Sequence, residues 1–228
     1  MMQDAPLLIL AGPAAVGKTT AVREILGADS RFSFVRSVTT RPPRGDGFDA
    51  EYLYLSEPEF LARRDSGELL EWMEYGHAMY GTPHSELARI RANGQIPLLI
   101  LDLCGVHSVR LATPPIPAYA IYLYTDLNTA EQRLYDRYLS PIPSVEGLRS
   151  FAGRKEANIR DYLTIREHTA DFDLFLSEAG TPREVADSIL AAYDSRSHRP
   201  QENERVAVSL TAQAEEKRQG SRQGGHTL

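Results

Sequence analysis

A glycine-rich octapeptide near the start of the chain has the residue types and the spacing needed to hold phosphate. Gly12-Pro13-Ala14-Ala15-Val16-Gly17-Lys18-Thr19 matches the pattern G-x-x-x-x-G-K-[ST]. Its glycines allow a tight turn in which several backbone N–H groups point at one anion, and a following helix adds its N-terminal dipole. In such loops the lysine reaches the β- and γ-phosphates and the hydroxyl ligates Mg²⁺. The predicted ATP-binding residues are therefore Gly12, Pro13, Ala14, Ala15, Val16, Gly17, Lys18, Thr19 and Thr20, with Lys18 catalytic and Thr19 on the metal.

A second group of residues could hold another anion. Arg41 and Arg44 flank a Pro-Pro pair in the stretch "RSVTTRPPRGDGFDAEYLY", with Ser37 upstream and Tyr52 downstream. Guanidinium groups bind phosphate well because their donors form a planar fork. The whole chain carries a net charge of -6 and has a pI of about 5.6, so these arginines are not part of a general basic surface. We therefore predict a local anion site here and no nucleic-acid binding.

The composition sets further limits. Cys104 is the single cysteine, which excludes a disulfide within the chain and fits a reducing compartment. The N-terminal stretch lacks the basic region of a signal peptide, and no run approaches the roughly 20 apolar residues that span a bilayer. We expect a cytoplasmic protein with no membrane partner.

Short apolar runs alternate with helical patterns along the chain. The predicted buried strands are Leu7–Ala11, Ile96–Leu103, Ala118–Tyr124 and Phe172–Leu176, with two further strands at Phe34–Val38 and Tyr52–Leu55. Strands joined through helices predict an α/β fold with a parallel sheet covered on both faces.

Helix signals separate these strands. A helix should follow the glycine-rich loop at Lys18–Leu26, closed by Gly27. Capping boxes predict helices that begin at Ser56 and Thr181, whereas Thr82-Pro83 and Asn128 mark two further starts. From 196 to 228 the chain is polar and poor in aromatics, and we expect it to be disordered or loosely helical.

Four motifs in one order resemble the guanylate kinase family over about Leu7 to Leu190. They are the phosphate loop, S-x-T-T-R-x-P-R from Ser37 to Arg44, the Glu71-Trp72 pair and the triplet Tyr80-Gly81-Thr82. The resemblance implies a P-loop kinase whose parallel sheet is flanked by helices, with a small nucleotide-monophosphate-binding insert and a helical lid. It divides residues 1–195 into a core (5–35, 95–127 and 155–195), an acceptor-binding insert (36–94) and a lid (128–154).

The resemblance also implies residue roles. Arg41, Arg44, Tyr52 and Tyr80 would hold the phosphate of GMP, and Glu71 would face its base with Ser37 and Thr82. Guanine chemistry agrees, because a carboxylate accepts from the N1–H and N2–H₂ donors and a hydroxyl can donate to O6. By contrast, Trp72, Tyr54 and Cys104 are expected to be buried packing residues.

Two places depart from the family pattern. Asp102 is implied at the GMP or metal site, directly or through water, but Ile100 stands where the family usually has a first acid. The lid pattern is best matched by Arg137 and Arg154, implied to be catalytic, with Arg133 and Arg160 nearby; the segment "SPIPSVEGLRS" between them is unlike the usual lid.

The implied activity is a phosphotransferase reaction of purine nucleotide metabolism, ATP-dependent phosphorylation of GMP or dGMP to GDP with Mg²⁺ as cofactor. Two alternatives remain open. One is a related kinase for another nucleoside monophosphate or a sugar phosphate, and the other is a non-catalytic phosphopeptide-binding module. The partners are expected to be small nucleotides, and the oligomeric state stays open between monomer and homodimer.

Overall fold

The computed structural model describes residues 5–43, 49–75 and 78–223. The chain divides into two compact units that we treat separately. The first comprises Met1–Ile9 and Val22–Tyr119, and the second comprises Leu10–Ala21 and Ala120–Leu228.

A five-stranded sheet has the strand order β2-β7-β1-β8-β9. The pair β2 (Phe32–Phe34) and β7 (Ile96–Ile100) is parallel, as is the pair β8 (Ala118–Tyr124) and β9 (Leu174–Ser177). All five residues of β1 (Leu7–Ala11) are buried, which explains why its sequence is continuously apolar rather than alternating. The predicted α/β class with a parallel sheet flanked by helices is confirmed.

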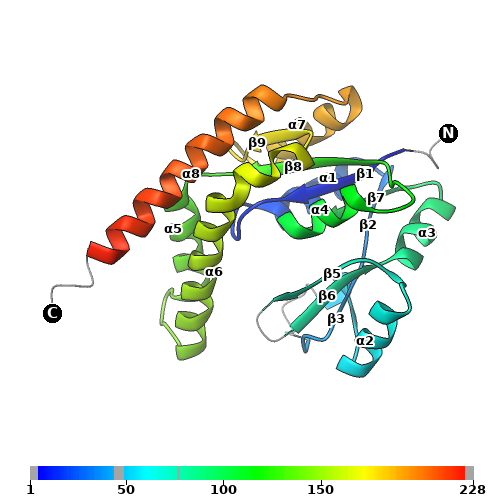
Figure 1. Ribbon diagram of the computed structural model, residues 1–228, viewed down its shortest axis with the longest axis horizontal. Helices are drawn as coiled ribbons and strands as arrows, with labels where there is room; N and C mark the ends of the chain where they lie inside the picture. The colour runs from blue at the N-terminus through cyan, green and yellow to red at the C-terminus, as the bar shows by residue number, and fades with distance from the viewer. Residues whose placement is uncertain (1–4, 44–48, 76–77, 224–228) are drawn as a thin grey trace. The chain divides into compact units, whose positions relative to one another are not determined.

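A separate four-stranded sheet with the order β4-β3-β6-β5 lies within the first unit. Its strands are β3 (Ser37–Thr39), β4 (Tyr52–Tyr54), β5 (Leu69–Tyr75) and β6 (Ala78–Pro83), and β4 follows a 3₁₀ turn at Asp49–Glu51. The described residues of this unit also form α2 (Glu57–Asp65), α3 (His84–Ala92) and α4 (Leu103–Leu111). Figure 1 shows α2 beside the strands of this smaller sheet.

The second unit carries most of the helices. Helix α1 (Lys18–Ala28) begins in it, and α5 (Leu127–Tyr138), α6 (Val145–Thr164), α7 (Pro182–Ser195) and α8 (Pro200–Gln223) follow, with a 3₁₀ segment at Ile165–Asp171. Helices α5, α6 and α8 lie side by side in Figure 1, and hydrogen bonds join α8 to the other two.

Local capping signals identify several helices correctly. The Ser56–Glu59 and Thr181–Glu184 capping boxes are both formed, with reciprocal side-chain bonds to the backbone. Helix α3 begins at His84, directly after the Thr82-Pro83 pair that marks its start in the sequence, and ends at Ala92.

Several predicted boundaries are wrong, and three of them have a clear cause. The expected strand Phe34–Val38 is two strands in two sheets, because the chain leaves β2 at Phe34 and enters β3 at Ser37. The strand expected to reach Leu103 ends at Ile100, since the Asp102 side chain caps α4 by accepting from the Gly105 N–H. Helix α5 is capped by Asp126 rather than Asn128.

The segment 196–228 was predicted to be disordered or loosely helical, and the structure shows a helix, α8, over Pro200–Gln223. Apolar positions at helical spacing bury one face of it, at Ala207, Leu210 and Ala214. Asn203 is fully buried on the same helix, where its side chain accepts from the Phe175 N–H at 2.8 Å and donates to the Phe172 carbonyl at 3.2 Å. A mostly polar sequence can therefore form a packed helix when its few apolar residues share one face.

None of the helices in the described part of the chain is both long enough and apolar enough to cross a membrane.

Candidate functional site

The phosphate loop, Gly12–Thr19, joins the end of β1 to the first turn of α1. Gly12 has a φ of 141°, and a Cβ there would lie 2.1 Å from the Leu123 carbonyl oxygen, so no other residue fits without displacing the strand. Gly17 has a φ of 103°, which also favours glycine, and α1 begins at the next residue. The loop therefore presents backbone amides and a helix N-terminus together, as phosphate binding requires.

Lys18 is turned onto the loop itself. Its Nζ donates to the Gly12 carbonyl at 2.6 Å and to the Pro13 carbonyl at 2.8 Å. Thr19 is half-buried in the first turn of α1, whereas Thr20 is exposed. The predicted loop residues thus form one continuous structure, and the Lys18 ammonium group is held against the loop by the carbonyl groups of Gly12 and Pro13.

Two side chains from outside the loop also hold it. Asn158 of α6 is 2 % exposed; its Oδ1 accepts from the Ala14 N–H at 2.7 Å, and its Nδ2 donates to the Ala14 carbonyl at 3.0 Å. Arg133 of α5 donates to the Ala15 carbonyl at 3.4 Å and pairs with Glu178 at 2.8 Å. The sequence named Arg133 only as a candidate near the lid. Asn158 lies in no recognisable motif and is 144 positions from its partner.

The two predicted lid arginines lie on α5 and α6, Arg137 near the end of α5 and Arg154 in the middle of α6. Arg137 is exposed in the last turn of α5. Arg154 is half-buried on α6, and its guanidinium carbon lies 5.7 Å from the ring centroid of Tyr138. Stacking on that ring holds the planar guanidinium group in one orientation.

In the first unit, Arg41 lies at the centre of an aromatic group. Its guanidinium carbon is 5.1 Å from the Tyr52 ring centroid and 5.9 Å from that of Tyr54, and only 9 % of the residue is exposed. The Tyr80 ring is 6.2 Å from that of Tyr52. We call Arg41, Tyr52, Tyr54 and Tyr80 the acceptor cluster. It holds one nearly buried cation among phenol groups.

The position of Tyr54 differs from the sequence prediction. It was expected to be a core residue, but it is half-buried, and its hydroxyl donates to Asp49 at 2.5 Å and accepts from Arg41 at 3.5 Å. Burial and the bond to Asp49 raise the pKa of Tyr54 to about 12, so it stays neutral. Asp49 also lies 3.8 Å from Arg41 and provides this cation with a nearby carboxylate.

Strand register brings further predicted residues to this cluster. Ser37 is the direct partner of Tyr52 in the parallel pair β3–β4, and Tyr80 is opposite Thr39 in the antiparallel pair β3–β6. Arg44 lies outside the described residues, so its predicted role stays a prediction.

Glu71 and Thr82 form the second predicted contact of this unit. They are direct partners across the β5–β6 pair, and the Thr82 hydroxyl donates to Glu71 at 2.6 Å. Both are buried, at 7 % and 1 % exposure. Burial raises the pKa of Glu71 to about 7; the Thr82 hydrogen bond opposes this rise and the charge of Asp102 adds to it.

Asp102 and Glu71 converge at Gly105. A Cβ on Gly105 would lie 3.1 Å from the Asp102 Oδ1 and 3.3 Å from the Glu71 Oε2, so glycine leaves room for both carboxyl groups. Asp102 caps α4 through a 2.7 Å bond from the Gly105 N–H. Asp102 therefore caps α4 and lies close to Glu71. Thr19, the other predicted metal ligand, belongs to the second unit.

Two packing predictions are wrong. Trp72 is 47 % exposed rather than in the core, and its ring is covered by the Arg64 guanidinium at 5.1 Å. Cys104 is exposed on α4 rather than buried. Trp72 is exposed although Glu71 beside it is buried, because successive residues of a strand face opposite sides of the sheet. Cys104 is exposed although Gly105 beside it is buried, because successive residues of a helix face different directions.

Comparison with known proteins gives consistent results. A family model described as guanylate kinase matches residues 4–144. The chain is 35 % identical over 157 residues to a guanylate kinase of Synechococcus sp. (strain JA-3-3Ab), covering 68 % of this chain and 71 % of that protein. It is 34 % identical over 136 residues to a guanylate kinase of Thermosynechococcus vestitus, covering 59 % and 71 %. The crystal structure of guanylate kinase from Anaplasma phagocytophilum has a similar fold, with a TM-score of 0.59 and 22 % identity over 86 % of this chain and 87 % of that one.

Proposed function

Because the chain belongs to the guanylate kinase family, we propose that it transfers the γ-phosphate of ATP directly to GMP or dGMP and so forms the nucleoside diphosphate. On this proposal the enzyme acts in purine nucleotide metabolism and in the cytoplasm. The core, the insert (36–94) and the lid (128–154) are then its three working parts.

The buried pair of Glu71 and Thr82 is the observation that supports GMP or dGMP as the acceptor. When ionised, the Glu71 carboxyl group is an acceptor only, and it matches the adjacent N1–H and N2–H₂ donors of guanine. On this proposal the Thr82 hydroxyl, which is 2.6 Å from the carboxylate, would also contact the base. Adenine would leave this carboxylate without those donors, and an unpaired buried acceptor is costly.

The acceptor phosphate would bind at the acceptor cluster. Arg41 supplies the charge and the fork of donors, and the hydroxyls of Tyr52 and Tyr80, with Ser37 and Arg44, supply further hydrogen bonds. Low exposure of Arg41 strengthens its attraction for a phosphate because less water screens the charge.

The donor nucleotide would bind at the phosphate loop. The donor set fits triphosphate chemistry, since an ammonium group, glycine-dependent backbone amides and the first turn of α1 occur in one short segment. Thr19, with Asp102 directly or through water, would hold Mg²⁺. When bound, the ion would offset the phosphate charge.

This reaction needs no general base, because the attacking atom is a phosphate oxygen that is already ionised. The main barrier is electrostatic, since two anions must meet in line. Lys18, Arg41, Arg137 and Arg154 are the residues we assign to offsetting that charge, and closure of the lid would exclude the water that otherwise hydrolyses ATP.

One observation favours a second candidate, a kinase for a different phosphorylated acceptor. Ile100 at the end of β7 provides no carboxylate at a position where the family usually has one, which removes a polar contact from the base site.

Incubation with Mg·ATP and a panel of GMP, dGMP, AMP, IMP, UMP, CMP and sugar phosphates, with ADP formation as readout, separates the candidates. Turnover selective for GMP and dGMP supports the proposal. Turnover with another acceptor alone selects the second candidate. No turnover with any acceptor, together with binding of phosphopeptides, would indicate a binding module instead.

A further inference from the structure

The contact between Asn158 and Ala14 assigns a role to a residue outside the phosphate loop. We propose that Asn158 is a positioning residue that sets the direction of the loop's amide groups, so that nucleotide affinity depends on a side chain of α6. This inference rests on the proposed use of the loop for ATP.

The geometry of the peptide groups carries the inference. In a trans peptide the C=O and the N–H point in opposite directions. Asn158 binds the N–H of the Pro13–Ala14 peptide on one side, while Lys18 binds its C=O on the other. Asn158 and Lys18 therefore bind opposite sides of the same planar peptide group.

The next peptide group is fixed in the same way. The Ala14 carbonyl accepts from the Asn158 Nδ2, so the Ala15 N–H, which belongs to the same peptide plane, points away from Asn158. Ala15 has a φ of 65°, a left-handed conformation that a residue with a Cβ adopts at some energetic cost. Asn158 thus stabilises a strained turn whose amides must converge on one anion.

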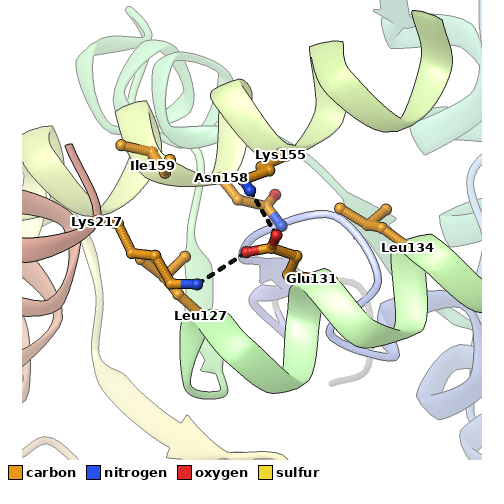
Figure 2. Close-up of a pocket in the computed structure, with 7 residues that line it drawn as sticks. All are labelled: Leu127, Glu131, Leu134, Lys155, Asn158, Ile159 and Lys217. Atoms are coloured by element: carbon orange, nitrogen blue, oxygen red, sulfur yellow. Dashed lines mark hydrogen bonds and ion pairs between the residues drawn. The ribbon is translucent and has the colours of Figure 1, made fainter. Parts of the chain in front are cut away.

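Asn158 is itself held firmly, as a positioning residue must be. One turn earlier on α6, Lys155 donates to Glu131 of α5 at 2.5 Å, and Lys217 of α8 donates to the same carboxylate at 2.9 Å. Figure 2 shows these three charged groups together with Asn158 around a small cavity lined by Leu127, Leu134 and Ile159. Three helices therefore fix the backbone that carries the Asn158 side chain.

The test measures binding separately from turnover. Asn158→Leu keeps the side-chain size and removes both hydrogen bonds, so it should weaken Mg·ATP binding about tenfold, with GMP binding within twofold of wild type. The matched control is Tyr162→Phe one turn further along α6, which removes a buried bond to Thr125 without touching the loop. This control should bind ATP within twofold of wild type.

Asn158→Asp supplies a second test that does not depend on the leucine variant folding. A protonated aspartic acid has one O–H donor and one carbonyl acceptor, like the amide, whereas an ionised one would repel the Ala14 carbonyl. The ratio of variant to wild-type ATP affinity should therefore rise as the pH falls from 8 to 5.5.

The outcomes distinguish the two claims. ATP affinity of Asn158→Leu within twofold of wild type, or a pH-independent ratio for Asn158→Asp, would overturn the role of Asn158. Wild-type protein that binds ATP but leaves GMP unphosphorylated would overturn the proposed acceptor while the ATP measurements still decide on Asn158. Wild-type protein that fails to bind ATP would overturn both.

Discussion

The Thr82 hydroxyl donates to the Glu71 carboxyl group at 2.6 Å across two antiparallel strands, and both side chains are buried. Buried polar groups require partners, and one Glu71 oxygen already has this one. The other oxygen, Oε2, lies beside Gly105, where Asp102 also approaches. This arrangement of a carboxyl group and a hydroxyl is the basis of the predictions about the acceptor base.

Replacing GMP by IMP removes the 2-amino donor that Glu71 would accept. Loss of a hydrogen bond to a charged group costs about 1.5–3 kcal/mol, so kcat/KM should fall roughly 10- to 150-fold. Glu71→Gln should lower kcat/KM for GMP more than for IMP and leave ATP affinity unchanged, because an amide presents a donor to the guanine donors. Steady-state kinetics with both acceptors measures this.

The exposed Glu74 on the same strand provides the matched control, and Glu74→Gln should keep the GMP preference. An equal loss for GMP, IMP and ATP in Glu71→Gln would mean that Glu71 only supports the fold.

GMP binding should release protons near neutral pH. Burial raises the pKa of Glu71 to about 7, and the guanine donors favour the ionised form, so binding lowers that pKa again. GMP affinity should therefore increase as the pH rises through 7. Calorimetry in buffers of different ionisation enthalpy measures the released protons, and the part due to Glu71 should be missing in Glu71→Gln. Identical proton release by the two proteins would contradict this.

Glu86 should make the fold sensitive to acid. Hydrogen bonds from Arg36, and secondarily from Arg89, lower the pKa of Glu86 to about 2 despite its burial. A lowered folded pKa contributes stability that is present above the ordinary value of 4.5 and is lost as the pH falls towards 2. Glu86→Gln should therefore cost about 1–2 kcal/mol at pH 7, since both arginines are half-exposed and water screens them.

Urea unfolding between pH 3 and 7 tests this, and the difference between wild type and Glu86→Gln should shrink as the pH falls. Asp187→Asn, which breaks an exposed pair with Arg183, should change stability by less than about 0.5 kcal/mol. A difference for Glu86→Gln that is constant with pH would be inconsistent with a lowered pKa.

Asn203 should stabilise the packing of α8 against the segment that contains Phe172 and Phe175. Asn203→Ala leaves the buried Phe175 N–H without its acceptor, which costs about 1–3 kcal/mol. Thermal unfolding should show a lower Tm, whereas Glu202→Ala, which removes an exposed pair with Arg199, should be nearly neutral. Equal Tm values for Asn203→Ala and wild type would show that α8 contributes little to stability.

Features determined by neighbouring residues were predictable from the sequence. The phosphate loop, the Ser56 and Thr181 capping boxes and the buried strand Ala118–Tyr124 depend on short-range chemistry or on one apolar run. Glu71, Thr82 and Arg41 followed from motifs, and strand register then brought Glu71 to Thr82.

Features determined by distant packing were not predictable. Asn158 has no motif, and only the fold brings it to Ala14. The burial of Asn203 depends on backbone groups about 30 positions away, so its segment looked like a polar tail. Trp72 and Tyr54 were assigned to the core from their size, although Arg64 covers the one and Asp49 binds the other.

Transfer of label from [γ-³²P]ATP to GMP tests the central claim most directly. Wild-type protein with Mg²⁺ should place the label in the β-phosphate of GDP and release little inorganic phosphate. Lys18→Ala should lose most of this transfer while binding GMP nearly as well as wild type, because the ammonium group acts at the donor phosphates. Label that stays in ATP, or that appears only as inorganic phosphate when GMP is present, would contradict the proposed reaction.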